Sequence, residues 1–174
     1  MKKILLILAL ITIGSAARAQ TLDETMTWLQ NKMDFYSRYV IIDSVGMLTE
    51  MSYYIDYQDD NACKVRITES AKAIGSAGYE FHFSEIDSTS IEVKQITSVY
   101  PYIKIHDDVF LIYLKTKSKN QIIYCSYKGA YNGPTFDDQL IIGVKTQDMA
   151  ERVARGLKHA VKLCSVKDDL FSQH

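Results

Sequence analysis

Recognisable catalytic and metal-binding motifs are missing from this sequence. It contains no CxxC pair, no HExxH, no GxSxG, no GxGxxG and no P-loop. The four histidines are His82, His106, His159 and His174. No two of them have the spacing of a metal-ligand pair. We therefore predict no catalytic residue, no metal and no cofactor, and an enzyme is the less favoured class.

Basic residues are not in excess. The chain has 20 Lys and Arg against 21 Asp and Glu, and residues 1–19 contribute Lys2, Lys3 and Arg18 but no acid. Without that segment, 17 basic residues stand against 21 acidic ones, a net charge of −4. Proteins that bind nucleic acid or anionic membranes usually carry a basic excess, so we expect neither partner.

Proline and glycine are also scarce, with 2 and 8 residues, and no stretch rich in them forms a linker. We find no internal repeat. The 155 residues that follow Ala19 suit one domain with a single hydrophobic core.

Only one long apolar run is present, at residues 4–13. It follows Lys2 and Lys3 and precedes the small residues Ala17 and Ala19, as in a cleavable signal peptide. An uncleaved membrane anchor is the alternative, but spanning a bilayer takes about 20 apolar residues. We predict a bacterial Sec-type signal peptide over 1–19, cleavage after Ala19, no later transmembrane segment, and a periplasmic or secreted protein.

The three cysteines are Cys63, Cys125 and Cys164. An oxidising compartment permits one disulfide and leaves one thiol over. The alternative is that all three are small buried residues. If a pair forms, Cys125 with Cys164 is the expected one, because a strand and a packed helix would bring them together.

Helical patterns open and close the chain after Ala19. Thr21 and Glu24 form a capping box, and apolar residues then recur at helical spacing over 21–37. A second amphipathic pattern covers 147–165, with Thr146 as its N-cap. We assign 20–38 to an N-terminal helix, 39–165 to a β domain that ends in this second helix, and 166–174 to a flexible tail.

Between the helices, apolar and polar residues alternate as in half-buried strands. Residues 53–57 and 65–67 read as a hairpin about a turn at 59–61, and 69–78 as a loop. Residues 110–114 read as a central strand that forms a hairpin with 122–125, and 140–144 as the last strand. The predicted fold is α+β: an N-terminal helix, an antiparallel bent sheet or partly open barrel of about seven strands, and an amphipathic C-terminal helix.

This order resembles the pleckstrin-homology-like architecture, in which a bent sheet is plugged by the final helix. The resemblance rests on 140–144 running into the helix 146–164, preceded by the hairpin 110–127. It implies a binding rather than a catalytic domain. Basic residues that bind phosphoinositides in some members are replaced here by an acidic turn at 59–61. A lipocalin-like or cystatin-like arrangement is the alternative.

Tyrosine is unusually abundant, with 12 residues. Tyrosine suits strands, but outward-facing rings also anchor partners or stack on ligands. Tyr53, Tyr54, Tyr57 and Tyr131 are the candidate binding surface, because adjacent strand residues face opposite ways.

The leading hypothesis is therefore an exported, non-catalytic binding or interaction domain for an unknown protein or small ligand. A contiguous exposed apolar patch would support a protein partner. One alternative is a hydrolase with a dispersed site that uses His82 or His106 as general base. Another is an inhibitor of a secreted enzyme.

Overall fold

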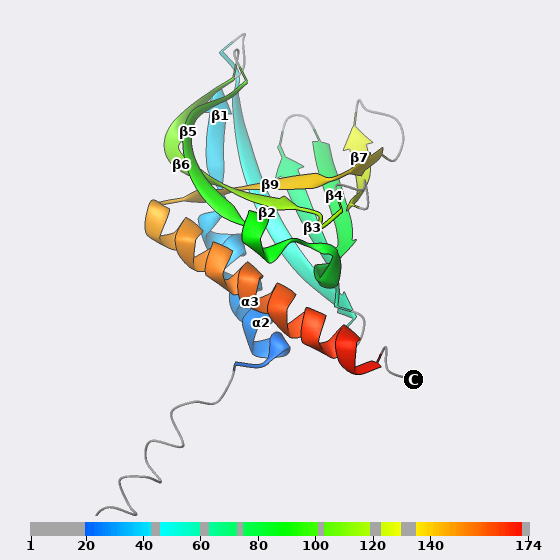
Figure 1. Ribbon diagram of the computed structural model, residues 1–174. Coiled ribbons are helices and arrows are strands. Elements are labelled where there is room, and N and C mark those ends of the chain that lie inside the picture. The colour runs from blue at the N-terminus through cyan, green and yellow to red at the C-terminus, as the bar shows by residue number, and fades with distance from the viewer. Residues whose placement is uncertain are drawn as a thin grey trace, which may run out of the picture.

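The computed structural model describes residues 20–42, 46–59, 63–72, 75–100, 103–118, 123–129 and 135–171. The predicted signal peptide, Tyr131 and Pro101 lie outside these residues. Figure 1 shows the helices packed together against one side of a strongly bent antiparallel sheet.

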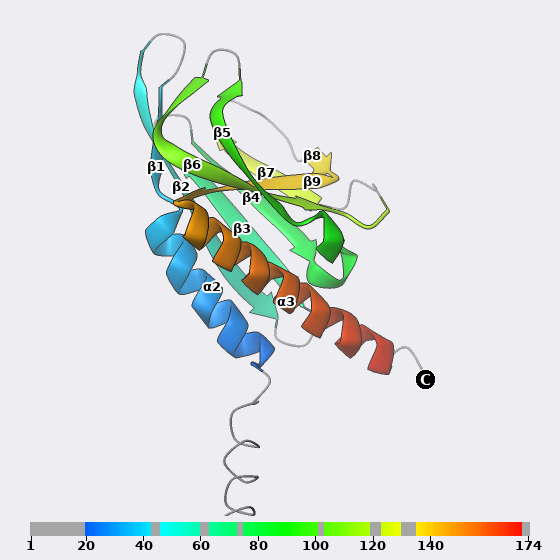
Figure 2. The ribbon, with the colours of Figure 1, turned by 60° about the vertical axis from the view of Figure 1, so that its left-hand side comes forward.

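The two helices, α2 (Leu22–Tyr36) and α3 (Gln147–Phe171), lie side by side (Figure 2). The capping box is confirmed: the Thr21 hydroxyl accepts from the Glu24 backbone N–H, and the Glu24 carboxylate accepts from the Thr21 backbone N–H at 2.8 Å. Helix α3 is longer than predicted and includes residues 166–171 of the expected tail. No glycine or proline after Cys164 stops it.

In the part of the chain that the structure describes, nine strands form the sheet, and their pairings are antiparallel. Two short 3-10 turns, η1 (Phe83–Glu85) and η2 (Ser88–Ser90), separate β4 from β5. The strands are β1 (Tyr39–Ile42), β2 (Leu48–Asp59), β3 (Lys64–Ala71), β4 (Gly75–His82), β5 (Glu92–Tyr100), β6 (Ile103–Lys115), β7 (Ile123–Gly129), β8 (Thr135–Asp137) and β9 (Gln139–Lys145).

Strand β6 joins two parts of the sheet. Residues 104 and 105 pair with β1, whereas 109–115 pair along the same edge with β9. The larger part therefore runs β1–β2–β3–β4–β7, with β8 added at its end, and the smaller part is β5–β6–β9. Asp138 alone separates β8 from β9, yet these strands belong to different parts. The predicted α+β fold with a bent, partly open sheet is confirmed.

The segment 69–78 is not the predicted loop. Strand β3 continues to Ala71 and β4 begins at Gly75, and their pairing includes Thr68 opposite Gly78. The small residues of this segment give no alternating apolar pattern, although backbone hydrogen bonds hold them in the sheet. This pairing lengthens β3 and β4, and the short strands β1 and β8 raise the number of strands in the described residues from about seven to nine.

The predicted hairpin over 110–127 is also wrong. Among the described pairings, β6 pairs with β5, β1 and β9, while β7 pairs with β4 and β8. Strands consecutive in sequence often pair, but here β9 occupies the edge of β6 that β7 was expected to take. Of the features behind the pleckstrin-homology-like resemblance, the succession of β9 and α3 is present.

The residue that joins β9 to α3 is Thr146, the predicted N-cap. Its carbonyl accepts the first helical hydrogen bond, from the Ala150 N–H at 3.1 Å. Its φ of 65° lies in the left-handed region instead of the extended region usual for a cap. A β-branched residue is strained there, so tertiary packing sets the angle between the strand and the helix.

A disulfide joins Cys63 to Cys164, not Cys125 to Cys164 as predicted. Cys63 lies at the β2–β3 turn and its carbonyl accepts from the N–H of Phe83 in η1, which packs against α3. The sheet curvature brings this turn to the helix, whereas Cys125 is on β7, between β4 and β8. The bond closes a sequence separation of 101 residues.

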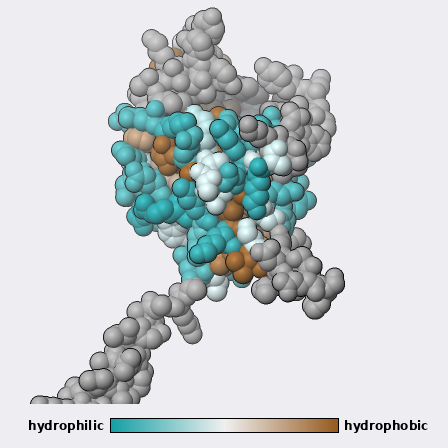
Figure 3. Space-filling model, viewed as in Figure 1, coloured by the Kyte–Doolittle hydropathy of each residue, from teal (hydrophilic) through white to brown (hydrophobic). Residues whose placement is uncertain are grey.

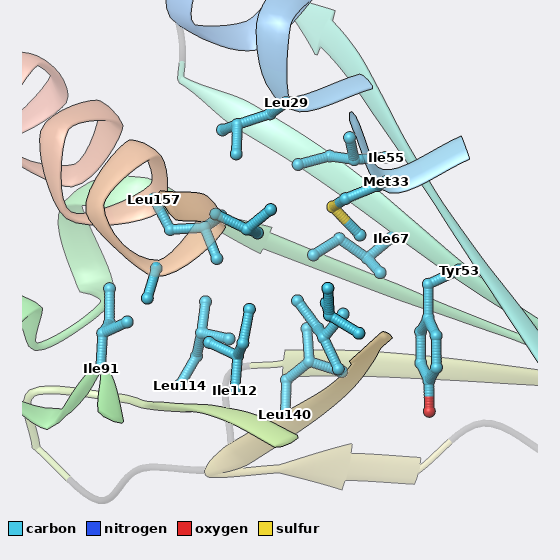
Figure 4. Packing of buried hydrophobic residues seen from close by; sticks show 14 of the residues in the cluster. Leu29, Met33, Tyr53, Ile55, Ile67, Ile91, Ile112, Leu114, Leu140 and Leu157 are labelled. Carbon is cyan, nitrogen blue, oxygen red and sulfur yellow. The ribbon is translucent and has the colours of Figure 1, made fainter. Parts of the chain in front are cut away.

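The apolar core lies between the helices and both parts of the sheet (Figure 4). Leu29 of α2 and Leu157 of α3 are fully buried, together with Ile55, Ile67 and Ile112 from the strands. The helices approach closely at Gly156, where an added Cβ would lie 3.0 Å from Leu29 Cδ2. The prediction of 110–114 as a central strand is confirmed, because β6 is paired on both edges there.

Candidate ligand-binding site

A carboxylate and two tyrosine hydroxyls meet on the inner face of the larger part of the sheet. Tyr53 Oη donates to Glu69 Oε1 at 3.1 Å, and Tyr79 Oη donates to Glu69 Oε2 at 2.8 Å. The register of β2 and β3 sets Tyr53 directly opposite Glu69, and Tyr79 comes from β4. Both carboxylate oxygens are therefore held in place by groups on neighbouring strands.

A third tyrosine, Tyr39 of β1, extends this group. Its ring stacks with that of Tyr53 at a centroid distance of 6.4 Å and an interplanar angle of 19°. Gly143 of β9 makes room for it: an added Cβ would lie 2.7 Å from the Tyr39 hydroxyl and closer still to ring atom Cε1. We call Tyr39, Tyr53, Tyr79 and Glu69 the tyrosine–glutamate cluster.

Burial keeps two of these phenols protonated. Tyr39 is 3% exposed and its pKa is raised to about 12, chiefly because burial disfavours the phenolate. Burial likewise raises the pKa of Tyr53 well above its usual value, and the nearby Tyr39 and Glu69 add to the effect. At neutral pH these side chains are neutral hydrogen-bond donors.

The Glu69 side chain is only half-buried, in contrast to Ile67, which lies two positions before it on the same strand and is fully buried. Within the described part of the chain it forms no ion pair. Figure 4 shows Tyr53 at the margin of the apolar core, with its hydroxyl pointing away from the two helices. The cluster therefore presents negative charge beside aromatic rings, an arrangement suited to binding.

The four predicted tyrosines do not form one outward surface. Tyr53 is 4% exposed and belongs to the cluster, and Tyr57, on the same face of β2, packs against the core. Tyr54 is half-buried on the opposite face, across from Thr68, and Tyr131 lies outside the described residues. The alternation of Tyr53 and Tyr54 was predicted correctly, but Tyr53 and Tyr57 are not surface anchors.

Sequence reasoning missed Tyr39, Tyr79, Gly143 and above all Glu69. A signal for Glu69 was present: Val65 and Ile67 face inward, so the period of two places Glu69 on the same face. Reading 69–78 as a loop hid a charged residue at an inward position of β3.

Exposed large apolar side chains are scattered in the described structure. They are Phe35 at the end of α2, Met47 and Leu48 at the start of β2, and Val166 late in α3. In the view of Figure 3 the hydrophobic areas are small and separated by hydrophilic ones. Met47 and Leu48 are adjacent in the chain, whereas Phe35 and Val166 lie on two different helices.

His82 lies within hydrogen-bonding distance of a serine. Its Nδ1 is 2.6 Å from Ser84 Oγ and also accepts from the Ser84 backbone N–H at 3.4 Å. These contacts cap the turn η1 at its N-terminus. The pair therefore has a local structural role, and the side chain of His106 lies outside the described residues.

Two further observations on the described residues concern metal binding and membrane spanning. No three His, Cys, Asp or Glu side chains there group as metal ligands would. None of the helices there has the length and apolar character needed to cross a bilayer.

The fold and the cluster together define an α+β protein with a two-part antiparallel sheet and an inward-facing polar group. Comparison with protein-family models, curated proteins and solved structures gave no match.

Proposed function

We propose that this protein is an exported, non-catalytic binding domain whose small ligand docks at the tyrosine–glutamate cluster. The supporting observation is Glu69, a half-buried carboxylate held by two tyrosine hydroxyls and without a cationic partner among the described residues. Charged groups in partly buried positions are normally compensated, so a charge left without a partner favours an external one.

Two features support export. Residues 1–19 have the charge, apolar length and small residues of a signal peptide. The disulfide between Cys63 and Cys164 is of the kind that persists in oxidising compartments such as the bacterial periplasm. Together they support the proposed periplasmic or secreted location.

A small ligand is favoured over a protein partner because the exposed apolar side chains are scattered, while the preorganised polar group faces inward. Binding is favoured over catalysis because the hydrogen bonds of Glu69 fix a carboxylate between donors without placing a nucleophile beside it.

The test is a thermal-shift screen of the purified protein against amines, amino acids, sugars and carboxylic acids, followed by titration calorimetry of the hits. Glu69→Gln is the test variant, and Glu80→Gln is its matched control. Glu80 is a carboxylate of β4, pairs with Lys64 and Arg66, and lies opposite Arg66 in the sheet register.

We expect hits that lose affinity in Glu69→Gln and keep it in Glu80→Gln. Hits that bind both variants equally well would contradict the cluster as the site. A screen without hits would contradict the small-ligand function.

The hydrolase alternative rests on the contact between His82 and Ser84. It predicts activity on an ester or amide substrate panel that disappears in Ser84→Ala. We expect no such activity, because the contact caps η1.

A further inference from the structure

We propose that the ligand of the tyrosine–glutamate cluster is a small organic cation that carries N–H donors, such as a protonated amine. This inference rests on the proposed function and specifies its ligand class. It follows from the charge, the hydrogen-bond polarity and the aromatic surroundings of Glu69.

Charge gives the first step. The cluster contains a carboxylate and three phenols and no basic side chain, and Glu69 forms no ion pair within the described residues. An anionic ligand would be repelled, and a neutral one would leave the partly buried charge uncompensated. A cation supplies the missing charge.

Hydrogen-bond polarity gives the second step. A tyrosine hydroxyl has one proton, and Tyr53 and Tyr79 each give theirs to Glu69. Each carboxylate oxygen then receives one of these bonds and has a further lone pair. What the carboxylate offers is acceptor capacity, so the matching ligand is a donor. An ammonium group has three donors and no acceptor.

The aromatic surroundings give the third step. The rings of Tyr39 and Tyr53 are stacked beside the carboxylate and almost fully buried, so they place its charge next to a region of low polarity, where its attraction for a cation is stronger than in water. Burial keeps both phenols protonated, so they add no negative charge of their own. On the other side of Glu69, the residue directly across from it on β4 is Ala77, and Tyr79 of the same strand reaches the carboxylate from two positions further along.

The opposing explanation is that Glu69 only positions the tyrosines. That role requires the same hydrogen bonds but predicts no preference among external ligands. A set of probes with similar shape and different charge therefore separates the two explanations.

The experiment is an NMR titration of the tyrosine ring signals in the purified protein with n-butylammonium, n-butanol, butyrate and tetramethylammonium. We expect saturable shifts with n-butylammonium and none with butyrate. Tetramethylammonium has the charge without the donors and should bind more weakly than n-butylammonium. In Glu69→Gln the affinity for n-butylammonium should fall about tenfold or more, because a charge-assisted hydrogen bond is lost. In Glu80→Gln it should be unchanged.

A second variant guards against misfolding of Glu69→Gln. Glu69→Asp keeps the negative charge on a shorter side chain, so it should bind n-butylammonium more tightly than Glu69→Gln. A folded Glu69→Asp that binds no more tightly than Glu69→Gln would overturn the inference.

The remaining outcomes separate this inference from the proposed function. If n-butanol or a screening hit without charge binds in a Glu69-dependent way, the binding function stands and the cation inference fails. Equal n-butylammonium affinity in Glu69→Gln also overturns the inference. If neither the probes nor the screen give binding, both fail.

Discussion

The interior of this protein has two regions that differ in chemistry although the same strands build both. In the helix-covered region, Ile55 and Ile67 meet Leu29 and Leu157 and are fully buried. Two residues along each strand lie Tyr53 and Glu69, where hydroxyls and a carboxylate replace methyl groups. One region is sealed by α2 and α3 and the disulfide, and the other keeps a half-buried charge.

This difference shows that the stability of the fold and its proposed binding role are carried by separate side chains. Apolar burial contributes roughly 25 cal/mol per Å², so the fully buried side chains of the helix-covered region stabilise the fold. A partly buried carboxylate contributes little or nothing to stability, so its presence at this position supports the proposed binding role. Substitutions in the two regions should therefore have separable effects on stability and binding.

The largest effect is expected from the disulfide. Replacing both Cys63 and Cys164 with alanine should lower the free energy of unfolding by about 4 kcal/mol, because the bond closes a long loop in the unfolded chain. Urea denaturation measures the loss, and Cys125→Ala is the control, with a smaller change. Equal losses in the two proteins would refute the specific role of this pair.

The next largest effect concerns the helix-covered core. Leu157→Ala should cost about 3 kcal/mol, because it leaves a cavity at a fully buried position. Tyr53→Phe, in the other region, should cost about 1 kcal/mol by removing one hydrogen bond. Urea denaturation of both variants tests the order, and a larger loss for Tyr53→Phe would show that the cluster is a main source of stability.

Gly143→Ala should alter the tyrosine–glutamate cluster from outside it. The new methyl group would overlap the Tyr39 ring, and overpacking of this kind costs about 2 kcal/mol. Near-ultraviolet circular dichroism should report the displaced tyrosine. Gly156→Ala is the control: its added Cβ would lie 3.0 Å from Leu29 and 3.2 Å from Trp28, so a spectral change there should come from the tryptophan band and not from Tyr39. An unchanged spectrum in Gly143→Ala would show that Tyr39 moves freely.

The smallest effect appears only at alkaline pH. Since the pKa of Tyr39 is about 12 in the folded protein and about 10 in an unfolded chain, the unfolded state loses its proton first. The contribution of Tyr39 to the free energy of unfolding is therefore fully present below about pH 10. It falls as the pH rises towards 12, by about 1 kcal/mol at pH 11. Denaturation curves at these values measure it, and Tyr39→Phe should remove this part of the loss. The same pH dependence in Tyr39→Phe would contradict the assignment.

Much of the fold could be predicted from local patterns. The capping box at Thr21 and Glu24, the hairpin of 53–57 with 65–67, the buried run 110–114 and the final strand and helix all rest on interactions within a few residues or on period. The part of β4 from Gly75 to Gly78 could not be predicted in this way, because glycines have no side chains to alternate between apolar and polar. Of the residues in the candidate site, only Tyr53 was predicted from the sequence, together with the alternation of side chains along β2.

The sequence by itself determined the order of the elements, which is a helix, then antiparallel strands, then a second helix, because caps and periodic burial are local properties. Only the tertiary structure decided that β9 pairs with β6, that Cys63 reaches Cys164, and that Tyr39, Tyr53 and Tyr79 surround Glu69. The cluster depends on the register of the four neighbouring strands β1 to β4, and the other two depend on the bend of the sheet, which brings together residues far apart in the chain. Such a bend results from packing of the whole sheet against α2 and α3, and no short window of sequence contains it.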